Sequence, residues 1–310
     1  MPHYDLLIVG ELNVDIIVRG AVTPRFGQAE QMVEDVALCA GSSSAIAAAS
    51  AARMGLRVLF ASRVGDDLFG RFMVSALQDA GVDTSGVCTD PAITTGATII
   101  LSRGQDRAIL TYPGSIAAVT AANLDPGWLD VTRHLHVASP FLLTGLRPAL
   151  PDIMRRARAA GMTLSLDTNW DPDERWDVAD MLDATDVFLP NENEARAIAG
   201  RERTEDAVDW LAEHIPLVVV KRGRDGALAA RGAERVAVPA YRTPVVDTTG
   251  AGDTFDGGFL AAWLHRQPLR RCLEMGCACA AGTIAQPGGL NGQPTWDEAL
   301  QRVLDSHEDV

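Results

Sequence analysis

The sequence predicts an α/β fold of three layers, in which helices cover both faces of a central, mostly parallel sheet and a small second β sheet projects from it. Short apolar runs typical of buried strands alternate along the chain with longer stretches of helical periodicity. Two segments rich in β-forming residues, near 15–37 and 92–111, interrupt that alternation. Because 47% of the 310 residues are hydrophobic, the chain can bury a large core.

Each predicted strand is a short apolar run, and each predicted helix is a longer stretch, of which the first two are stopped by a glycine. The run from Leu6 to Val9 ends at Gly10, and an alanine-rich helical stretch is stopped by Gly55. The predicted strands are 6–9, 57–61, 134–138, 163–166, 187–189 and 217–220. The predicted helices are 44–54, 69–80, 151–160, 204–214 and 254–264. With neither an internal repeat nor a long linker, we expect residues 1–310 to form one domain.

Charge and composition exclude several classes of protein. With 27 Lys and Arg against 41 Asp and Glu, the net charge is −14, which disfavours binding to nucleic acid or to an anionic membrane. No apolar run reaches the roughly 18 residues that span a bilayer. The N-terminus shows no signal-peptide pattern, and the number of cysteines, five, is odd. We therefore expect a cytoplasmic protein with reduced thiols.

The seven residues from Asp247 to Asp253 read Asp-Thr-Thr-Gly-Ala-Gly-Asp and lead directly into a predicted helix. Glycines 250 and 252 predict a turn that points backbone N–H groups outward at a helix N-terminus, where the helix dipole favours an anion. A carboxylate there suits the removal of a proton from a hydroxyl that attacks a phosphoryl group. The alternative is that Asp253 caps the helix after an ordinary glycine turn.

This motif, extended through Thr254 and Phe255, resembles the C-terminal signature of the PfkB (ribokinase-like) carbohydrate kinases, and other segments resemble the family in order along the chain. The resemblance implies that Asp253 is the general base and that the amides of Gly250, Ala251 and Gly252 hold the charge that develops during transfer. It also implies a ribokinase-like fold whose small sheet is a β lid over the sugar. Such lids often pair two subunits, so we expect a homodimer.

The acceptor would lie where the first strand ends. Asn13 and Asp15 follow this strand, and both side chains can bind sugar hydroxyls, although turn formation would also explain them. Gly41 and Ser42 occupy the place of the family's N-terminal glycine signature. Asn169 belongs to a segment that resembles the family's Asp-Pro-Asn-x-Arg motif. The resemblance implies that these five residues contact the acceptor.

Two positions depart from the family pattern. Ile46 stands where the family usually has a substrate-binding Asn, and it would place an apolar wall beside the acceptor. Asp171 stands where relatives that bind sugar acids have a cation. Because like charges repel, Asp171 predicts a neutral acceptor.

The nucleotide would lie on the other side of the signature. Asn191 and Glu194 resemble the family's Asn-x-x-Glu motif, which positions Mg²⁺ and the phosphates; an acidic helix start is the alternative explanation. We expect Glu194 to act on Mg²⁺ through water. The resemblance also implies ATP contacts from Lys221, Gly223 and Thr249. Asp247, together with Thr249, resembles the ligands of a monovalent cation, K⁺, that some members need.

These patterns predict an ATP-dependent kinase that phosphorylates a hydroxymethyl group of a small neutral sugar or nucleoside. The alternative is a sugar- or nucleoside-binding regulator that kept the fold and lost turnover; the intact Asp253 disfavours it. A Rossmann dehydrogenase is disfavoured because Phe255 stands where the third glycine is required. The sequence has neither a phosphate-binding Gly-x-x-x-x-Gly-Lys loop nor the His-Arg-Asp loop of protein kinases.

Overall fold

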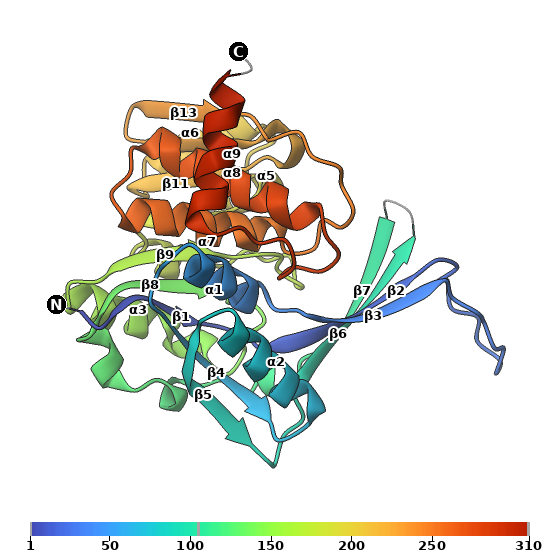
Figure 1. Cartoon of the computed structure of the whole chain (residues 1–310). Helices are drawn as coiled ribbons and strands as arrows, with labels where there is room; N and C mark the ends of the chain where they lie inside the picture. The colour runs from blue at the N-terminus through green and yellow to red at the C-terminus, as the bar shows by residue number, and fades with distance from the viewer. Residues whose placement is uncertain (1, 104–105, 309–310) are drawn as a thin grey trace.

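The structure is a computed structural model that describes residues 2–103 and 106–308. Residue 1 and residues 309–310 of the predicted domain, and residues 104–105 of the second predicted β segment, lie outside this description. The strands of the described residues form two sheets (Figure 1). The large sheet has the order β13-β12-β11-β10-β9-β8-β1-β4-β5, and the small sheet has the order β3-β2-β6-β7.

The large sheet is parallel from β5 to β11 and ends in an antiparallel hairpin of β12 and β13. Its strands are β1 Tyr4–Val9, β4 Val58–Gly65, β5 Asp83–Asp90, β8 Thr132–Ala138, β9 Thr163–Asp167, β10 Val187–Phe188, β11 Leu217–Lys221, β12 Ala227–Arg231 and β13 Glu234–Val238. Side chains alternate between its faces, so Leu6 and Ile8 enter one hydrophobic core and Leu7 and Val9 enter the other.

Helices cover both faces of this sheet and complete the two cores. One face carries α1 Ser43–Arg53, α2 Leu68–Asp79, α7 Ala251–Leu264, α8 Leu269–Ile284 and α9 Trp296–Glu308. The other carries α3 Leu150–Ala159, α4 Ala179–Leu182, α5 Glu192–Ala199 and α6 Thr204–Ala212. Short 3₁₀ turns lie at Gly114–Ile116, Ala121–Asn123, Pro126–Leu129, Arg147–Ala149 and Gly223–Asp225. The predicted three-layer α/β fold is confirmed, and within the described part of the chain no helix is long and apolar enough to cross a bilayer.

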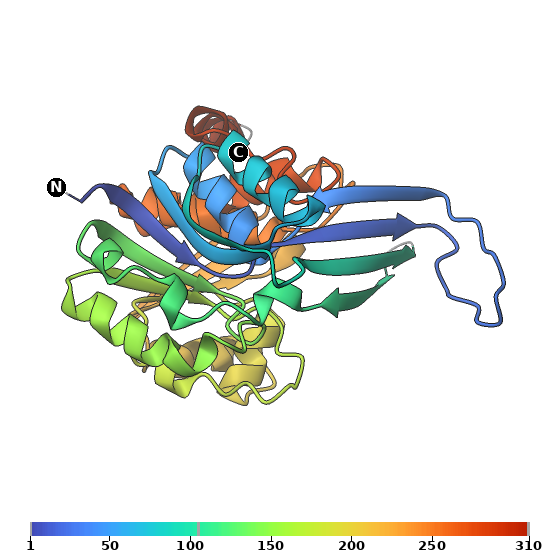
Figure 2. The same ribbon diagram turned by 90° about the horizontal axis from the view of Figure 1, so that it is seen from below.

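The small sheet projects from one edge of the main body, as Figure 2 shows. It consists of β2 Asn13–Arg19, β3 Asp35–Ala40, β6 Gly96–Arg103 and β7 Asp106–Tyr112, close to the two predicted segments. Asp15, Thr98 and Thr111 lie side by side on one face. The opposite face, here called the outer face, is apolar and consists of Ile16, Val18, Val36, Leu38, Ile99, Leu101, Leu110 and Tyr112.

The order of the strands reverses at β1. From β1 the chain proceeds outward through β4 and β5, and it then returns to the other side of β1 with β8 and continues through β9, β10 and β11. At such a reversal, the loops that follow the two adjacent strands diverge, and ligands of open α/β sheets bind in the crevice outside the carboxyl ends.

The helix after the glycine turn begins earlier than the sequence predicts. α7 starts at Ala251, not at 254, with Gly250 as its N-cap at φ 71°. Thr254 N donates to Gly250 O at 2.8 Å. Packing of α7 against neighbouring helices in the core outweighs the poor helix propensity of Gly252. Asp253 therefore lies inside the first helical turn, which rules out the alternative that it is the N-cap.

Candidate active site

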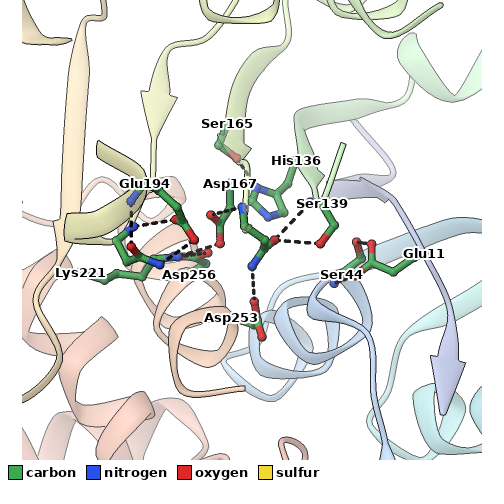
Figure 3. Close-up of polar contacts among 12 residues, drawn as sticks. Glu11, Ser44, His136, Ser139, Ser165, Asp167, Glu194, Lys221, Asp253 and Asp256 are labelled. Carbon is green, nitrogen blue, oxygen red and sulfur yellow. Dashed lines mark hydrogen bonds and ion pairs between the residues drawn. The ribbon is translucent and has the colours of Figure 1, made fainter. Parts of the chain in front are cut away.

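Polar and charged side chains gather at the carboxyl ends of five adjacent parallel strands, opposite the N-terminus of α7 (Figure 3). Each strand supplies at least one of these side chains at or just after its last residue. The position of the site therefore follows from the order of the strands in the sheet. These residues are Glu11 and Asn13 after β1, Ser139 after β8, Asp167 and Asn169 from β9, Asn191 and Glu194 after β10, and Lys221 at the end of β11.

Asp253 lies in the first turn of α7 with only 9% of its surface exposed. Asn169 Nδ2 donates to Asp253 Oδ1 at 3.4 Å. Asn169 adopts φ 51° and is fixed through its Oδ1, which accepts from Ser139 N at 3.2 Å and Ser139 Oγ at 2.9 Å. The structure thus brings the predicted base and the predicted acceptor contact Asn169 together.

Burial raises the pKa of Asp253, and the negative charge of Asp167 raises it further. The charge of Lys221 and the hydrogen bond from Asn169 act in the opposite direction without cancelling the rise. A carboxylate with increased proton affinity, next to the positive end of a helix, is suited to accept a proton from a hydroxyl.

The turn that precedes Asp253 has no room for a side chain at position 250. A Cβ on Gly250 would lie 2.8 Å from Ile46 Cδ1 and 2.9 Å from Gly289 Cα, and the φ of 71° also favours glycine. Ile46 is almost fully buried behind this turn. Ile46 thus packs against the signature turn, and its predicted role as an apolar wall beside the acceptor stays a prediction.

Lys221 lies beneath the same turn. Its Nζ is 2.7 Å from Asp167 Oδ2 and 3.0 Å from Asp256 Oδ2, and both carboxylates are buried. A Cβ on Gly252 would lie 3.6 Å from Lys221 Nζ, so the ammonium is close to the amides that the sequence predicts to hold the transferred charge. The sequence predicts an ATP contact for Lys221, and the structure adds two carboxylate partners that the sequence analysis missed.

The protonation states of Lys221, Asp167 and Asp256 depend on one another. Burial would lower the pKa of Lys221, but the charges of Asp167 and Asp256 raise it above its usual range. Burial raises the pKa of Asp256 well above normal, whereas Lys221 and hydrogen bonds lower that of Asp167 despite burial. The negative charge of Asp167 contributes to the raised pKa of Asp256. We assign the charge to Asp167 and the proton to Asp256, which leaves the buried cluster neutral.

Asn191 and Glu194 form a reciprocal cap at the start of α5. Asn191 N donates to Glu194 Oε2 at 2.8 Å, Asn191 Nδ2 donates to Oε1 at 2.6 Å, and Glu194 N donates back to Asn191 Oδ1 at 3.0 Å. Burial and the charge of Asp167 raise the pKa of Glu194 to about 7. Each carboxylate oxygen keeps a free lone pair, so the pair can still accept hydrogen bonds from metal-bound waters.

The remaining predicted nucleotide contacts lie at two glycine turns. Gly223 adopts φ 53°, and nothing lies within 4 Å of the place where its Cβ would be, so its backbone has an open side. Thr249 N donates to Asp247 Oδ1 at 2.9 Å, which fixes the first half of the signature turn.

The predicted acceptor residues meet at the base of the small sheet. Asn13 Nδ2 donates to Asp15 Oδ1 at 3.4 Å and to Thr98 Oγ1 at 3.3 Å. A Cβ on Gly41 would lie 2.2 Å from Asp15 Oδ1, so only glycine fits beside this carboxylate. Burial raises the pKa of Asp15 to about 7, and the charges of Asp253 and Glu11 contribute.

Glu11 is a site residue that the sequence analysis missed. It is buried, and its carboxylate accepts from Ser44 Oγ at 2.6 Å and from Ser44 N at 3.2 Å. Ser42, predicted to contact the acceptor, caps α1 at φ 71° and donates to Glu11 O at 2.5 Å. The sequence did contain a signal for Glu11. It is a charged residue that follows a buried strand and Gly10, at the point where the chain leaves the sheet and where ligands of such sheets bind.

The structure gives the carboxylate of Asp171 a role in its own loop that the sequence did not predict, and its effect on an acceptor stays a prediction. The carboxylate is buried and accepts the backbone N–H groups of Asp173, Arg175 and Trp176 at 2.8–3.0 Å. These bonds hold the loop after Asn169 in shape. The carboxylate is thus engaged with its own loop.

The sequence profile described as "pfkB family carbohydrate kinase" matches residues 5–296 of the chain. An ATP-dependent ribose-1-phosphate kinase from Halopiger xanaduensis is 30% identical and aligns over 94% of this chain and 95% of its own length. A 2-dehydro-3-deoxygluconokinase from Bacillus subtilis is 30% identical over 87% and 88% of the two chains. A ribokinase from Haemophilus influenzae is 25% identical over 96% and 97%.

Solved structures of similar fold cover nearly the whole chain. A putative ribokinase II from E. coli, in complex with ATP and Mg²⁺, has a TM-score of 0.86 at 24% identity and covers 97% of this chain and 99% of its own. Arabidopsis thaliana ribokinase, complexed with ribose and ATP, has a TM-score of 0.84 at 23% identity, with 97% and 98% covered. At these identities the likeness concerns the fold alone, and it confirms the ribokinase-like architecture.

Proposed function

The chain belongs to the pfkB family of carbohydrate kinases, and we propose that it transfers the γ-phosphoryl group of ATP to a hydroxymethyl group of a small neutral sugar or nucleoside. The observation that carries the proposal is the position of Asp253: a buried carboxyl of raised pKa in the first turn of α7, next to an anion-binding turn. A protein that only bound a sugar would gain nothing from burying this charge.

In the proposed reaction, Asp253 accepts the proton of the acceptor hydroxyl while that oxygen forms its bond to the γ-phosphorus. The bond from the γ-phosphorus to the bridging oxygen breaks, and ADP leaves. The amides from Gly250 to Gly252 donate to the phosphoryl oxygens, and the positive charge of Lys221 lies beneath them. Asp15 and Asn169 orient the acceptor. Mg²⁺, when bound, would neutralise charge on the phosphates, with Asn191 and Glu194 holding its waters.

Three buried carboxyl groups on the acceptor side support a neutral acceptor. Asp253 and Glu11 raise the pKa of Asp15, and Asp253 raises that of Glu11, so each is within electrostatic reach of another. An anionic acceptor would add one more negative charge to this group. Arg107 of β7, whose charge acts on Asp15, is a cation that could offset it. The relatives do not decide this point, because their names include a sugar, a sugar phosphate and a sugar acid.

A panel of acceptors tests the proposed function. We expect a neutral sugar or nucleoside to exceed its matched acid, for example an aldose against its aldonic acid, by at least about tenfold in kcat/KM. Two like charges about 4 Å apart at an effective dielectric near 20 repel by up to roughly 4 kcal/mol, of which a tenfold preference needs only a part. A preference for the acid would contradict the neutral acceptor and point to Arg107. Tight binding without any transfer would favour the regulator.

Replacement of Glu194 by glutamine should raise the Mg²⁺ concentration needed for half-maximal rate more than it raises the KM of the acceptor. The reason is that Glu194 is proposed to act on metal-bound waters. Because its pKa is raised to about 7, the Mg²⁺ requirement of the wild type should also rise as the pH falls below about 7. Titrations of rate against Mg²⁺ measure both effects. Glu192→Gln, at the same helix start, is the matched control, and a change in acceptor KM alone would place Glu194 in the acceptor site.

We also propose that the outer face of the small sheet pairs with the same face of a second chain. Val36, Leu38, Leu110 and Tyr112 are each about half exposed there, and a contiguous apolar patch of this kind is typical of an interaction surface. Light scattering that gave the mass of a single chain would contradict the homodimer.

The five cysteines are all unbonded, which suits the cytoplasm as the proposed compartment, and cell fractionation would test this.

A further inference from the structure

Asp247, the first residue of the signature, receives three hydrogen-bond donors from three different parts of the chain. Its Oδ1 accepts from Thr249 N at 2.9 Å, and its Oδ2 accepts from Gly288 N at 3.1 Å. Oδ2 also accepts from Arg19 Nη2 at 3.3 Å. The side chain of Asp247 is only 13% exposed, so this carboxylate is committed to partners within the protein.

Arg19 comes from the small sheet, 228 residues before Asp247. It is the last residue of β2, and its Nη1 donates to Asp35 Oδ2 of β3 at 2.7 Å. The guanidinium therefore bridges a carboxylate of the small sheet and the first carboxylate of the signature turn. Its side chain is 29% exposed, so the bridge is partly shielded from water.

These contacts do not fit the monovalent cation that the family resemblance implies at Asp247. Such an ion needs oxygen atoms whose lone pairs are free and face it. The carboxylate of Asp247 already accepts three N–H groups, and one of these belongs to a permanent cation. A second cation on the same carboxylate would have to displace Arg19 or stand against its charge.

We propose that Arg19 is the chain's own cation at Asp247, so that the enzyme needs no added monovalent cation, and that this ion pair couples the small sheet to the anion-binding turn. The turn is linked to its surroundings at short range. Asp247 fixes Thr249 and Gly288, and Gly250 packs against Gly289. A shift in the position of Asp247 would therefore also shift the backbone amides that we propose to hold the phosphoryl group.

A tethered guanidinium differs from a dissolved ion in one respect. Its presence at Asp247 depends on where β2 lies, and β2 also carries Asp15, which orients the acceptor. Arg19 is thus a positioning residue, which acts through Asp247. The position of the sheet that covers the acceptor and the shape of the turn that holds the phosphoryl group are linked by one ion pair.

The test measures ATP binding and thermal stability in buffers of K⁺, Na⁺ or choline, with Mg²⁺ constant. We expect the wild type to bind ATP with the same affinity and to melt at the same temperature in all three buffers. In choline, Arg19→Gln should weaken ATP binding by about 5-fold, the size expected for a partly exposed ion pair. K⁺ should restore part of this loss, and Arg19→Lys should stay close to the wild type. Arg103→Gln, an exposed arginine at the end of β6, is the control and should match the wild type.

Two results would overturn the proposal: a wild type that binds ATP more tightly in K⁺ than in choline, or an Arg19→Gln variant that matches the wild type in every buffer. The proposal rests on the proposed function in its account of transfer, but these measurements need no acceptor. Failure to detect transfer with any acceptor would therefore count against the kinase function and leave the binding result to decide on Arg19.

Discussion

Replacement of Asp253 by asparagine should lower the rate of phosphoryl transfer by about 10²–10⁴-fold, the usual loss when a general base is removed. The amide has the shape of the carboxyl group, and its oxygen can still accept from Asn169 Nδ2. It cannot take the proton of the acceptor hydroxyl. Steady-state turnover on the acceptor found in the panel measures the effect, with Asp66→Asn, an exposed carboxylate, as the control. Turnover near that of the wild type would contradict the assigned role.

The same variant should not lose stability. Burial raises the pKa of Asp253 above its ordinary value, so the folded protein holds this proton more tightly than the unfolded chain does. Stability contributed in this way is present at low pH and is lost as the pH rises through the raised pKa. Because asparagine carries no charge, its melting temperature at neutral pH should equal or exceed that of the wild type. The wild type, in turn, should lose activity as the pH falls and Asp253 becomes protonated.

Replacement of Lys221 by methionine should destabilise the protein by about 3–5 kcal/mol, because it leaves Asp167 as an uncompensated buried charge. The apparent free energy of unfolding in denaturant measures this loss. Arg235→Met is the matched control, since Arg235 pairs with Asp209 at the surface and an exposed pair contributes only about 0–1 kcal/mol.

A double variant separates the two roles of Lys221. With Lys221→Met, a second change of Asp167→Asn removes the orphaned charge, so we expect most of the stability to return. Transfer should stay low, because the ammonium close to Gly252 is still missing. If the double variant recovered both stability and transfer, Lys221 would have a structural role alone.

The sequence predicted the sheet and most helices because these depend on local patterns. The apolar run of β1 and the alanine-rich stretch of α1 are bounded by glycine, and burial on both faces of a parallel sheet produces such runs. The start of α7 was misplaced because glycine and alanine at 250–252 do not reveal how a helix is packed. The strands at the sheet edges, β5, β12 and β13, carry weaker apolar patterns and were not predicted.

The site was predictable only where a short motif carries it. The roles of Lys221 and Asp167 as partners could not be found, because 54 residues separate them and nothing local encodes their pairing. Asp256 offered a signal, since it is a lone charge on an otherwise apolar stretch of α7. For Asp171, only the structure shows that its carboxylate accepts hydrogen bonds from its own loop, because nothing in the sequence reveals that fold of the chain.

The division of the site between two sheets has a practical consequence for protein engineering. Asp15 and Arg107, which we propose to act on the acceptor, belong to the small sheet, whereas Asp253 and Lys221 belong to the main body. Part of the proposed acceptor recognition is thus encoded apart from the proposed base, although Asn169, after β9, belongs to the main body. A chimaera that receives residues 13–40 and 96–112 from a relative should shift its acceptor preference toward that of the relative. It should keep the residues that we propose to carry out phosphoryl transfer. Such a graft would have to preserve the ion pair between position 19 and Asp247, which joins the small sheet to the signature turn.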